Sequence, residues 1–322
     1  METRSLPQTP LTVSRVCFGT MTFGGQTDEA TARTMVDRCL EQGVNFLDTA
    51  NLYHQGAAET ILGRLLKGRR EQVVLASKVA GKMGSDPDQV GLSRAAILRA
   101  ADESLRRLQT DYLDLYYLHW PDYQVPLEET LEALGTLQRA GKVRHVAASN
   151  YAAWQLVQLR WLAEKKPLPA IHVVQPMYNL LARGIEQELL PMCRAFGLAT
   201  FVYNPLAGGL LTGKQDFAAP APGTRFDQNQ IYLDRYWHAA NFDAVRELTA
   251  IAQAAGRSLV SLALNWVLHH TPVDGLILGA SRLSQLEENL RAVEEGPLAP
   301  EVIAACDRVW QRLHGPIPRY NR

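Results

Sequence analysis

SRAAILRAADESLRRLQTDYLDLYYLH, residues 93–119, contains one helix and one strand in direct succession. Apolar side chains recur at helical spacing behind Ser93, a residue that often caps the start of a helix. These side chains belong to Ile97, Ala101, Leu105 and Leu108. The stretch Tyr112–His119 is apolar on both faces, as expected for a strand of a parallel sheet that helices cover. The pattern therefore predicts a helix packed beside a parallel strand.

Stretches of these two kinds alternate along the whole chain. We expect strands at Val16–Gly19, Asn45–Asp48, Gln72–Lys78, Tyr112–His119, Val143–Ser149, His172–Gln175, Leu198–Tyr203 and Gly275–Gly279. We expect helices at 28–42, 57–67, 93–108, 127–140, 151–163, 185–196, 239–255 and 282–293. Strands that alternate with helices, without a break in composition, predict a single-domain α/β fold, a (β/α)8 TIM barrel over residues 1–322.

Three segments lie outside the alternating units. Residues 1–14 contain two prolines and are expected to form an N-terminal β-hairpin that plugs the base of the barrel. Residues 204–238 form a long loop after the seventh strand, and long loops in compact domains are often functional. Residues 297–322 are expected to add a C-terminal helix and a proline-rich tail. A doubly wound sheet is the competing fold, but residues 19–25 read GTMTFGG instead of the GxGxxG turn that such sheets usually carry.

Composition excludes several classes of protein. The chain has 322 residues, of which 47% are hydrophobic and 20% charged, so it can bury a full core. Lys and Arg number 33 against 33 Asp and Glu, without the basic excess of a nucleic-acid binder. No apolar run approaches about 18 residues, so we expect no membrane span, and the N-terminus lacks an apolar signal core.

The cysteines point to an intracellular protein. Their positions are Cys17, Cys39, Cys193 and Cys306. None forms a CxxC pair or has zinc-ligand spacing, and each lies in an apolar stretch. We therefore expect buried, reduced thiols, a cytoplasmic location and no metal site.

Polar and aromatic side chains stand at the carboxyl ends of seven consecutive expected strands, where barrels of this kind carry their active sites. They are Asp48, Lys78, His119, Ser149-Asn150, Gln175, Tyr203-Asn204 and the run Gly279 to Arg282, and Tyr53 follows five residues after Asp48. Singly, most have an ordinary explanation: Asp48 can cap a turn, and His119 can be a core histidine. Lys78 is harder to explain by packing, because a lysine rarely ends an apolar strand without a partner.

Together, Asp48, Tyr53, Lys78 and His119 allow one specific kind of chemistry. A phenol with a pKa of about 10 is a poor proton donor at neutral pH, and we expect the Lys78 ammonium to lower the pKa of Tyr53. Asp48 can keep the lysine charged, and a neutral His119 can orient a carbonyl oxygen. Such a set can protonate the alkoxide that forms when hydride adds to an aldehyde or ketone. The hydride requires a nicotinamide cofactor, since the sequence offers no metal site to supply it.

With these residues the sequence resembles the aldo-keto reductases along essentially its whole length. The motifs are Gly43-Val-Asn-Phe-Leu-Asp-Thr-Ala50 followed by Tyr53, Glu59 and Gly63, then Val74–Lys78, Asp114–His119, Ser149-Asn150 and Gln175–Tyr178. The resemblance implies a catalytic tetrad of Asp48, Tyr53, Lys78 and His119, with Tyr53 as general acid/base. It also implies NADP(H) bound extended across the barrel mouth, without a Rossmann fold.

The chain looks closest to the aflatoxin-aldehyde and succinic-semialdehyde reductase branch. That resemblance rests on residues 149–154 (SNYAAW), 204–214 (NPLAGGLLTGK) and 294–298 (EEGPL). The second segment is close to a P-loop, but Gln215 stands where a P-loop requires Ser or Thr. Its backbone amides are instead expected to cradle the cofactor pyrophosphate, with Lys214 assisting.

The remaining expected cofactor contacts involve the nicotinamide and the 2′-phosphate. Ser149 and Asn150 are expected to form hydrogen bonds with the carboxamide of the nicotinamide, and Tyr203 offers a ring that can stack on it. Some reductases of this family bind the 2′-phosphate of NADP(H) with a Lys-Ser pair. This chain has Gly279 and Ala280 at those positions, so Arg282 is the expected phosphate ligand. The full expected set is Gly19, Thr20, Met21, Asp48, Ser149, Asn150, Gln175, Tyr203, Asn204, Pro205, Leu206, Ala207, Gly208, Gly213, Lys214, Arg225, Gly279, Ser281, Arg282, Gln285, Glu288 and Asn289.

The expected substrate is a small carbonyl compound: an aldehyde, including a semialdehyde or carboxyl-bearing aldehyde, and some ketones. Its expected contacts are Tyr53, His119, Trp120, Arg225 and Arg322. Arg225 and Arg322 would bind a distant carboxylate while Tyr53 and His119 hold the aldehyde. Alternatively, Arg225 clamps the cofactor pyrophosphate or is simply solvated.

Two other functions stay open. One is a class I aldolase-type lyase in which Lys78 forms a Schiff base. The other is a non-catalytic, cofactor-sensing regulatory subunit of the same fold, resembling potassium-channel β-subunits. The chain is expected to be a monomer or a homodimer, without nucleic-acid or membrane partners.

Overall fold

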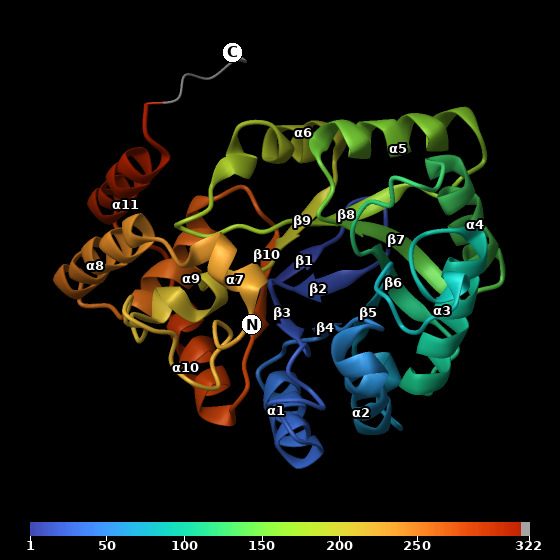
Figure 1. Ribbon diagram of the computed structural model, residues 1–322, viewed down its shortest axis with the longest axis horizontal. Helices are drawn as coiled ribbons and strands as arrows, with labels where there is room; N and C mark the ends of the chain where they lie inside the picture. The colour runs from blue at the N-terminus through green and yellow to red at the C-terminus, as the bar shows by residue number, and fades with distance from the viewer. Residues whose placement is uncertain (317–322) are drawn as a thin grey trace.

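The structure, a computed structural model, describes residues 1–316. Eight parallel strands within that range close into a barrel in the order β10-β3-β4-β5-β6-β7-β8-β9, surrounded by helices (Figure 1). The strands are β3 Val16–Gly19, β4 Phe46–Asp48, β5 Val74–Val79, β6 Leu113–Leu118, β7 Val143–Ser149, β8 Ile171–Gln175, β9 Ala199–Val202 and β10 Gly275–Gly279. Because all eight run in parallel, their carboxyl ends open at one face, which we call the mouth. The expected α/β TIM barrel is confirmed.

The helices cover the outside of the barrel. They are α1 Glu29–Glu41, α2 Ala57–Leu65, α3 Arg94–Leu108, α4 Leu127–Arg139, α5 Ala153–Lys165, α6 Leu189–Phe196, α7 Gln230–Tyr236, α8 Ala239–Ala254, α9 Leu259–His270, α10 Leu283–Glu294 and α11 Pro300–His314. Ser93 caps α3 as the sequence predicts, because its side chain accepts a hydrogen bond from the Ala96 amide. The observed ends of most elements lie within one or two residues of the expected ones.

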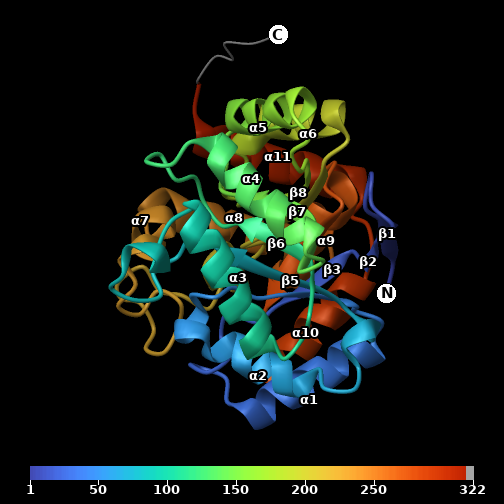
Figure 2. The ribbon, with the colours of Figure 1, turned by 90° about the vertical axis from the view of Figure 1, so that its right-hand side faces the viewer.

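The strands separate two apolar cores. Alternate strand residues, such as Ala76 and Tyr117, point into the barrel, while their neighbours pack under the helices. Leu6, Leu11 and Val13 belong to the same cluster as the barrel interior. They come from the hairpin of β1 (Thr3–Ser5) and β2 (Thr12–Ser14), which lies on the side opposite α7 (Figure 2). The hairpin therefore closes the base, as expected, and leaves the mouth for the site.

The helix between β9 and β10 is not the one that the sequence analysis assigned. Residues 239–255 do form α8, but α8 packs against α11 at the periphery. The barrel position belongs to α9, whose residues Leu259–Leu268 are all buried. A helix buried on every side has no polar stripe, so its period is not visible in the hydrophobic pattern.

The long segment 204–238 is more ordered than the expected loop. It contains a 3₁₀ turn at Ala207–Thr212 and the short helix α7, which lies in front of the barrel mouth (Figure 1). The C-terminal helix α11 is present as expected. None of the helices in residues 1–316 is long and apolar enough to cross a membrane. The four cysteines are buried and unpaired, as the sequence predicts.

Candidate active site

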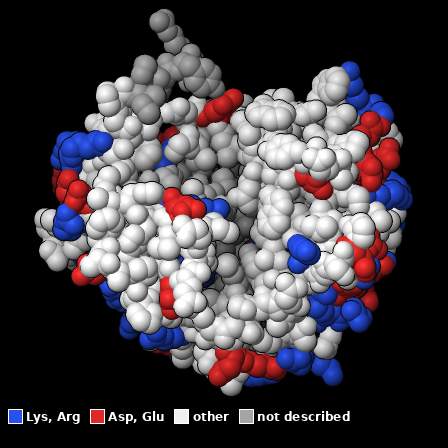
Figure 3. Space-filling model, in the orientation of Figure 1, with Lys and Arg blue, Asp and Glu red and all other residues white. Residues whose placement is uncertain are grey.

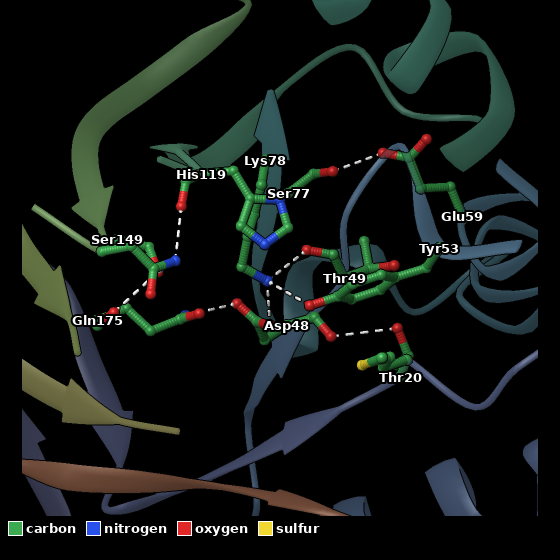
Figure 4. Close-up of polar contacts among 12 residues, drawn as sticks. Thr20, Asp48, Thr49, Tyr53, Glu59, Ser77, Lys78, His119, Ser149 and Gln175 are labelled. Carbon is green, nitrogen blue, oxygen red and sulfur yellow. Dashed lines mark hydrogen bonds and ion pairs between the residues drawn. The ribbon is translucent and has the colours of Figure 1, made fainter. Parts of the chain in front are cut away.

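The mouth face is hollowed near its centre, and most charged side chains lie around its periphery (Figure 3). Polar strand ends converge there from around the barrel, as the parallel topology requires. Figure 4 shows the resulting group of side chains, with Lys78 at its centre.

Lys78 enters the barrel because it shares the inward face of β5 with Val74 and Ala76. Its ammonium is fully buried and donates to the Asp48 carboxylate. It also donates to the Thr49 carbonyl at 2.8 Å and to the Tyr53 hydroxyl at 3.3 Å. Three acceptors satisfy the three N–H groups of the lysine, so the charge is compensated without water.

Asp48 is held on both carboxylate oxygens. One accepts from Lys78, and the other accepts from the Gln175 side-chain amide at 3.0 Å. The backbone carbonyl of Asp48 also accepts from the Thr20 hydroxyl at 3.1 Å. Gln175, expected to contact a cofactor, therefore also fixes the orientation of the carboxylate, a link between β8 and β4 that the sequence pattern did not indicate.

His119 lies beside Tyr53 at the end of β6. The centroids of the two rings are 6.1 Å apart and the planes nearly perpendicular. Asn150 donates to the His119 carbonyl at 2.8 Å, and Trp120, which is 38% exposed, packs on the His119 ring. The buried Nδ1 atom of His119 has no hydrogen-bond partner among residues 1–316.

The protonation states follow from burial and from Lys78. Burial opposes the charge on Lys78, but Asp48 and Tyr53 outweigh it and raise the pKa of the ammonium. Burial, and to a lesser degree Lys78, lower the pKa of His119 well below its usual value, so the imidazole is neutral. The expected lowering of the Tyr53 pKa is wrong: burial raises this pKa, and Lys78 offsets only part of the increase. The phenol therefore keeps its proton at neutral pH.

Ser149, Asn150 and Tyr203 form a second polar group beside the first. Ser149 donates to the Gln175 carbonyl at 2.8 Å, and the Tyr203 hydroxyl donates to the Asn150 side-chain oxygen at 2.7 Å. Asn150 adopts a positive φ of 62°, a conformation that asparagine tolerates better than most residues. The group lies next to His119, where the sequence analysis places the carboxamide of a cofactor.

The segment 204–214 turns tightly. Ala207, Gly208 and Gly213 all have positive φ, and at least four N–H groups of the segment donate to its own backbone carbonyls. The buried Nδ2 atom of Asn204 has no hydrogen-bond partner among the described residues. This unpaired amide fits a bound polar or anionic group. No helix begins directly after Lys214, because the next one, α7, begins at Gln230, so the segment does not continue as a P-loop would.

The rim beside this run is built by the start of α10. Arg282 caps that helix and its exposed guanidinium makes no hydrogen bond or ion pair within residues 1–316. Gln285 accepts from both the amide and the hydroxyl of Ser281. Glu288 lies 3.7 Å from the ammonium of Lys214, which brings two distant segments together. The unpaired cation at a helix N-terminus is suited to a phosphate group.

The other expected cofactor residues also lie at the mouth or in the segment above it. Gly19 and Gly279 are paired at the ends of β3 and β10, and Thr20 is buried. Met21 is 37% exposed, and Asn289 is buried within α10. Pro205 and Leu206 precede the 3₁₀ turn.

Two arginines of the 204–238 segment differ in their contacts. Arg225 is half-buried and donates to the Met21 sulfur at 3.0 Å and the Tyr232 hydroxyl at 3.2 Å, so it is not a solvated loop residue. Arg235, on α7, is exposed and lies near Tyr203. Burial raises the pKa of Tyr203, and Arg235 offsets only part of that increase. The sequence pattern did not indicate Arg235, because a helix as short as α7 leaves little periodicity within a segment expected to be a loop. Arg322 lies outside the described residues.

Comparisons with known proteins show which family the chain is similar to. The model of the "Aldo/keto reductase family" matches residues 15–311. The chain is 39% identical to aflatoxin B1 aldehyde reductase member 2 from Homo sapiens over 95% of this chain and 89% of that protein. It is 39% identical to the uncharacterized oxidoreductase YrpG from Bacillus subtilis, covering 99% of this chain and 98% of that protein. A probable voltage-gated potassium channel subunit beta from Arabidopsis thaliana is 35% identical, over 97% of each chain.

The neutral state of His119 has a consequence for stability. Below about pH 6.5 the unfolded chain protonates this histidine while the folded chain does not, so stability falls as the pH drops. His119→Gln removes the part of the pH-dependent stability loss that His119 causes. Urea unfolding at pH 7 and pH 5 should show a smaller loss of stability in the variant than in the wild type, by up to about 2 kcal/mol. Equal losses would show that the folded protein protonates His119 normally.

Proposed function

The chain belongs to the aldo/keto reductase family, and on that premise we propose that it reduces aldehydes to alcohols with NADPH. Its match to an aldehyde reductase and to an oxidoreductase along nearly the whole chain supports an oxidoreductase activity. The observation that carries the finer proposal is the contact of one buried ammonium, Lys78, with both Asp48 and the Tyr53 hydroxyl.

In this proposal Tyr53 donates its proton to the carbonyl oxygen of the substrate. The raised pKa keeps the proton on the phenol until negative charge develops on that oxygen. Lys78 then stabilises the phenolate that remains, since its ammonium already lies 3.3 Å from the hydroxyl. Neutral His119 donates a hydrogen bond that orients the carbonyl, and Asp48 keeps Lys78 charged.

The residues of the mouth fit a nicotinamide dinucleotide. Asn150 and Ser149 offer amide and hydroxyl groups to a carboxamide. The tight turn of 204–214, with the unpaired side-chain amide of Asn204, is the proposed site of the pyrophosphate. Arg282 offers an unpaired guanidinium to a 2′-phosphate, which supports NADPH over NADH. When bound, the cofactor supplies the hydride that reduces the carbonyl carbon.

The contacts of Lys78 weigh against the aldolase-type alternative. A Schiff base requires a neutral amine, whereas Asp48 and Tyr53 raise the pKa of this lysine despite its burial. The similarity to a potassium channel subunit keeps the regulatory alternative testable. NADPH binding without turnover of any carbonyl compound would favour it.

Tyr53→Phe should leave NADPH affinity intact and lower kcat by a factor on the order of 10²–10⁴, because it removes the proton donor. Lys78→Met should be comparably damaging, and the double variant little worse than either single one. The measurement is NADPH oxidation with a panel of succinic semialdehyde, 2-carboxybenzaldehyde, methylglyoxal and 4-nitrobenzaldehyde. A Tyr53→Phe enzyme that keeps more than roughly a tenth of the wild-type kcat would exclude Tyr53 as the acid.

Arg282→Ala should weaken NADPH binding far more than NADH binding, because only NADPH carries the 2′-phosphate. A charge-assisted contact of about 1.5–3 kcal/mol corresponds to a roughly 10- to 150-fold increase in Kd. Fluorescence titration with both cofactors measures the two constants. If both rise equally, Arg282 serves the structure of the rim and not the phosphate.

We propose a preference for aldehydes with a distant carboxylate, held by an arginine of the 204–238 segment. Arg225→Gln should raise KM for succinic semialdehyde about tenfold or more and spare uncharged 4-nitrobenzaldehyde. Arg235→Gln is the matched comparison, because its guanidinium lies 5.8 Å from the ring of the same Tyr232. If Arg225→Gln affects both substrates equally and weakens NADPH, Arg225 is a cofactor clamp. If only Arg235→Gln shows the selective effect, Arg235 binds the carboxylate.

A further inference from the structure

We propose that Glu59 is a positioning residue: its buried ion pair with Arg107 fixes the turn that holds Tyr53 against Lys78. The inference rests on the proposed role of Tyr53 as proton donor. Glu59 lies behind the site, bonded to Ser77 and Arg107, and has no hydrogen bond or ion pair with Tyr53 or Lys78. Figure 4 shows it bonded to Ser77 on the outer side of the strand that carries Lys78.

The turn after Tyr53 is strained. His54, Gln55 and Gly56 have φ angles of 47°, 53° and 87°, three consecutive residues in the left-handed region. Residues other than glycine avoid that region, so two of the three conformations are unfavourable. Such a turn persists only when the surrounding structure holds it. Because it directly follows Tyr53, any relaxation would move the phenol relative to Lys78.

Glu59 supplies that support from the first turn of α2. Its side chain is fully buried, and its carboxylate accepts from the Ser77 hydroxyl at 2.5 Å and from Arg107 Nε at 2.7 Å. Ser77 and Lys78 are neighbours on β5 that point to opposite faces of the strand. The carboxylate therefore connects the helix that follows Tyr53 to the strand that presents Lys78, and both to α3 through Arg107.

Arg107 also contacts the strained turn itself. A Cβ atom on Gly56 would lie 2.7 Å from Arg107 Cδ, so the arginine stem packs directly against the backbone of this glycine. A Cβ atom on Gly63 would lie 2.5 Å from the Arg107 carbonyl, so α2 and the end of α3 also approach closely there. The ion pair thus holds the first turn of α2, next to the point where the turn after Tyr53 meets the helix.

The contribution of a buried ion pair to folding stability is too small to explain why this one is present. Desolvation of the two charges offsets much of their attraction, and apolar residues often serve a core as well. Holding a reacting group in a fixed position benefits catalysis instead of stability, because a displacement of about 1 Å lowers the rate by up to roughly 100-fold. The directional bonds of Glu59 to two elements supply such a geometry to Tyr53.

The test compares Glu59→Gln with Asp114→Asn. Asp114 is a matched control: it is buried and paired with Arg70 at 2.7 Å and Arg144 at 2.8 Å, but near the amino ends of the strands. Glu59→Gln should lower kcat for carbonyl reduction about tenfold or more, with NADPH Kd and KM within about twofold. Asp114→Asn should leave kcat unchanged. Ser77→Ala, which removes one bond to the carboxylate, should show the same effect more weakly and serves if Glu59→Gln fails to fold.

Two further measurements separate positioning from general damage. In a Tyr53→Phe background, Glu59→Gln should cause no further loss of the residual rate, because it acts through the phenol. Hydrogen exchange of the peptide around residues 52–58 should speed up in Glu59→Gln and not in Asp114→Asn. An unchanged kcat, a loss that persists in the Tyr53→Phe background, or unchanged exchange would overturn the inference. The exchange readout needs no activity, so it tests the turn even if the wild type reduces no carbonyl compound and the proposed function fails.

Discussion

A lysine ammonium buried inside a barrel must find partners, and the site is organised around that requirement. Lys78 has no access to water, so its three N–H groups donate hydrogen bonds to the Asp48 carboxylate, the Thr49 carbonyl and the Tyr53 hydroxyl. Asp48 in turn needs a donor for its other oxygen, and Gln175 provides it from across the barrel. The charge thus determines the orientation of side chains from β4, β5 and β8.

The same burial decides which proton states the site presents. Low access to water raises the pKa of Tyr53 more than Lys78 lowers it, and it keeps His119 neutral. In the proposed mechanism, Lys78 therefore stabilises the phenolate that forms during proton donation and does not produce an acidic phenol beforehand. Such electrostatic stabilisation acts most strongly where charge develops.

The support for this group extends behind the barrel wall. Alternation along β5 sends Lys78 inward and Ser77 outward, so one strand links the buried ammonium to the Glu59–Arg107 ion pair. The segment 204–238 lies on the other side, over the mouth, and contributes an ordered backbone run and two arginines with different contacts. In the proposed function, chemistry and recognition are therefore carried by different parts of the fold, a strand-based centre and a loop-based rim.

The sequence by itself determined the barrel, the hairpin at its base and the four residues that meet at the mouth. These follow from local periodicity and from the rule that parallel strands expose their carboxyl ends on one face. Three features came only from the tertiary structure: the barrel position of α9, the contact of Gln175 with Asp48, and the raised pKa of Tyr53. A helix buried on all sides shows no period, and residues 127 positions apart leave no local pattern. The pKa depends on how far water is excluded, which only the packed fold decides.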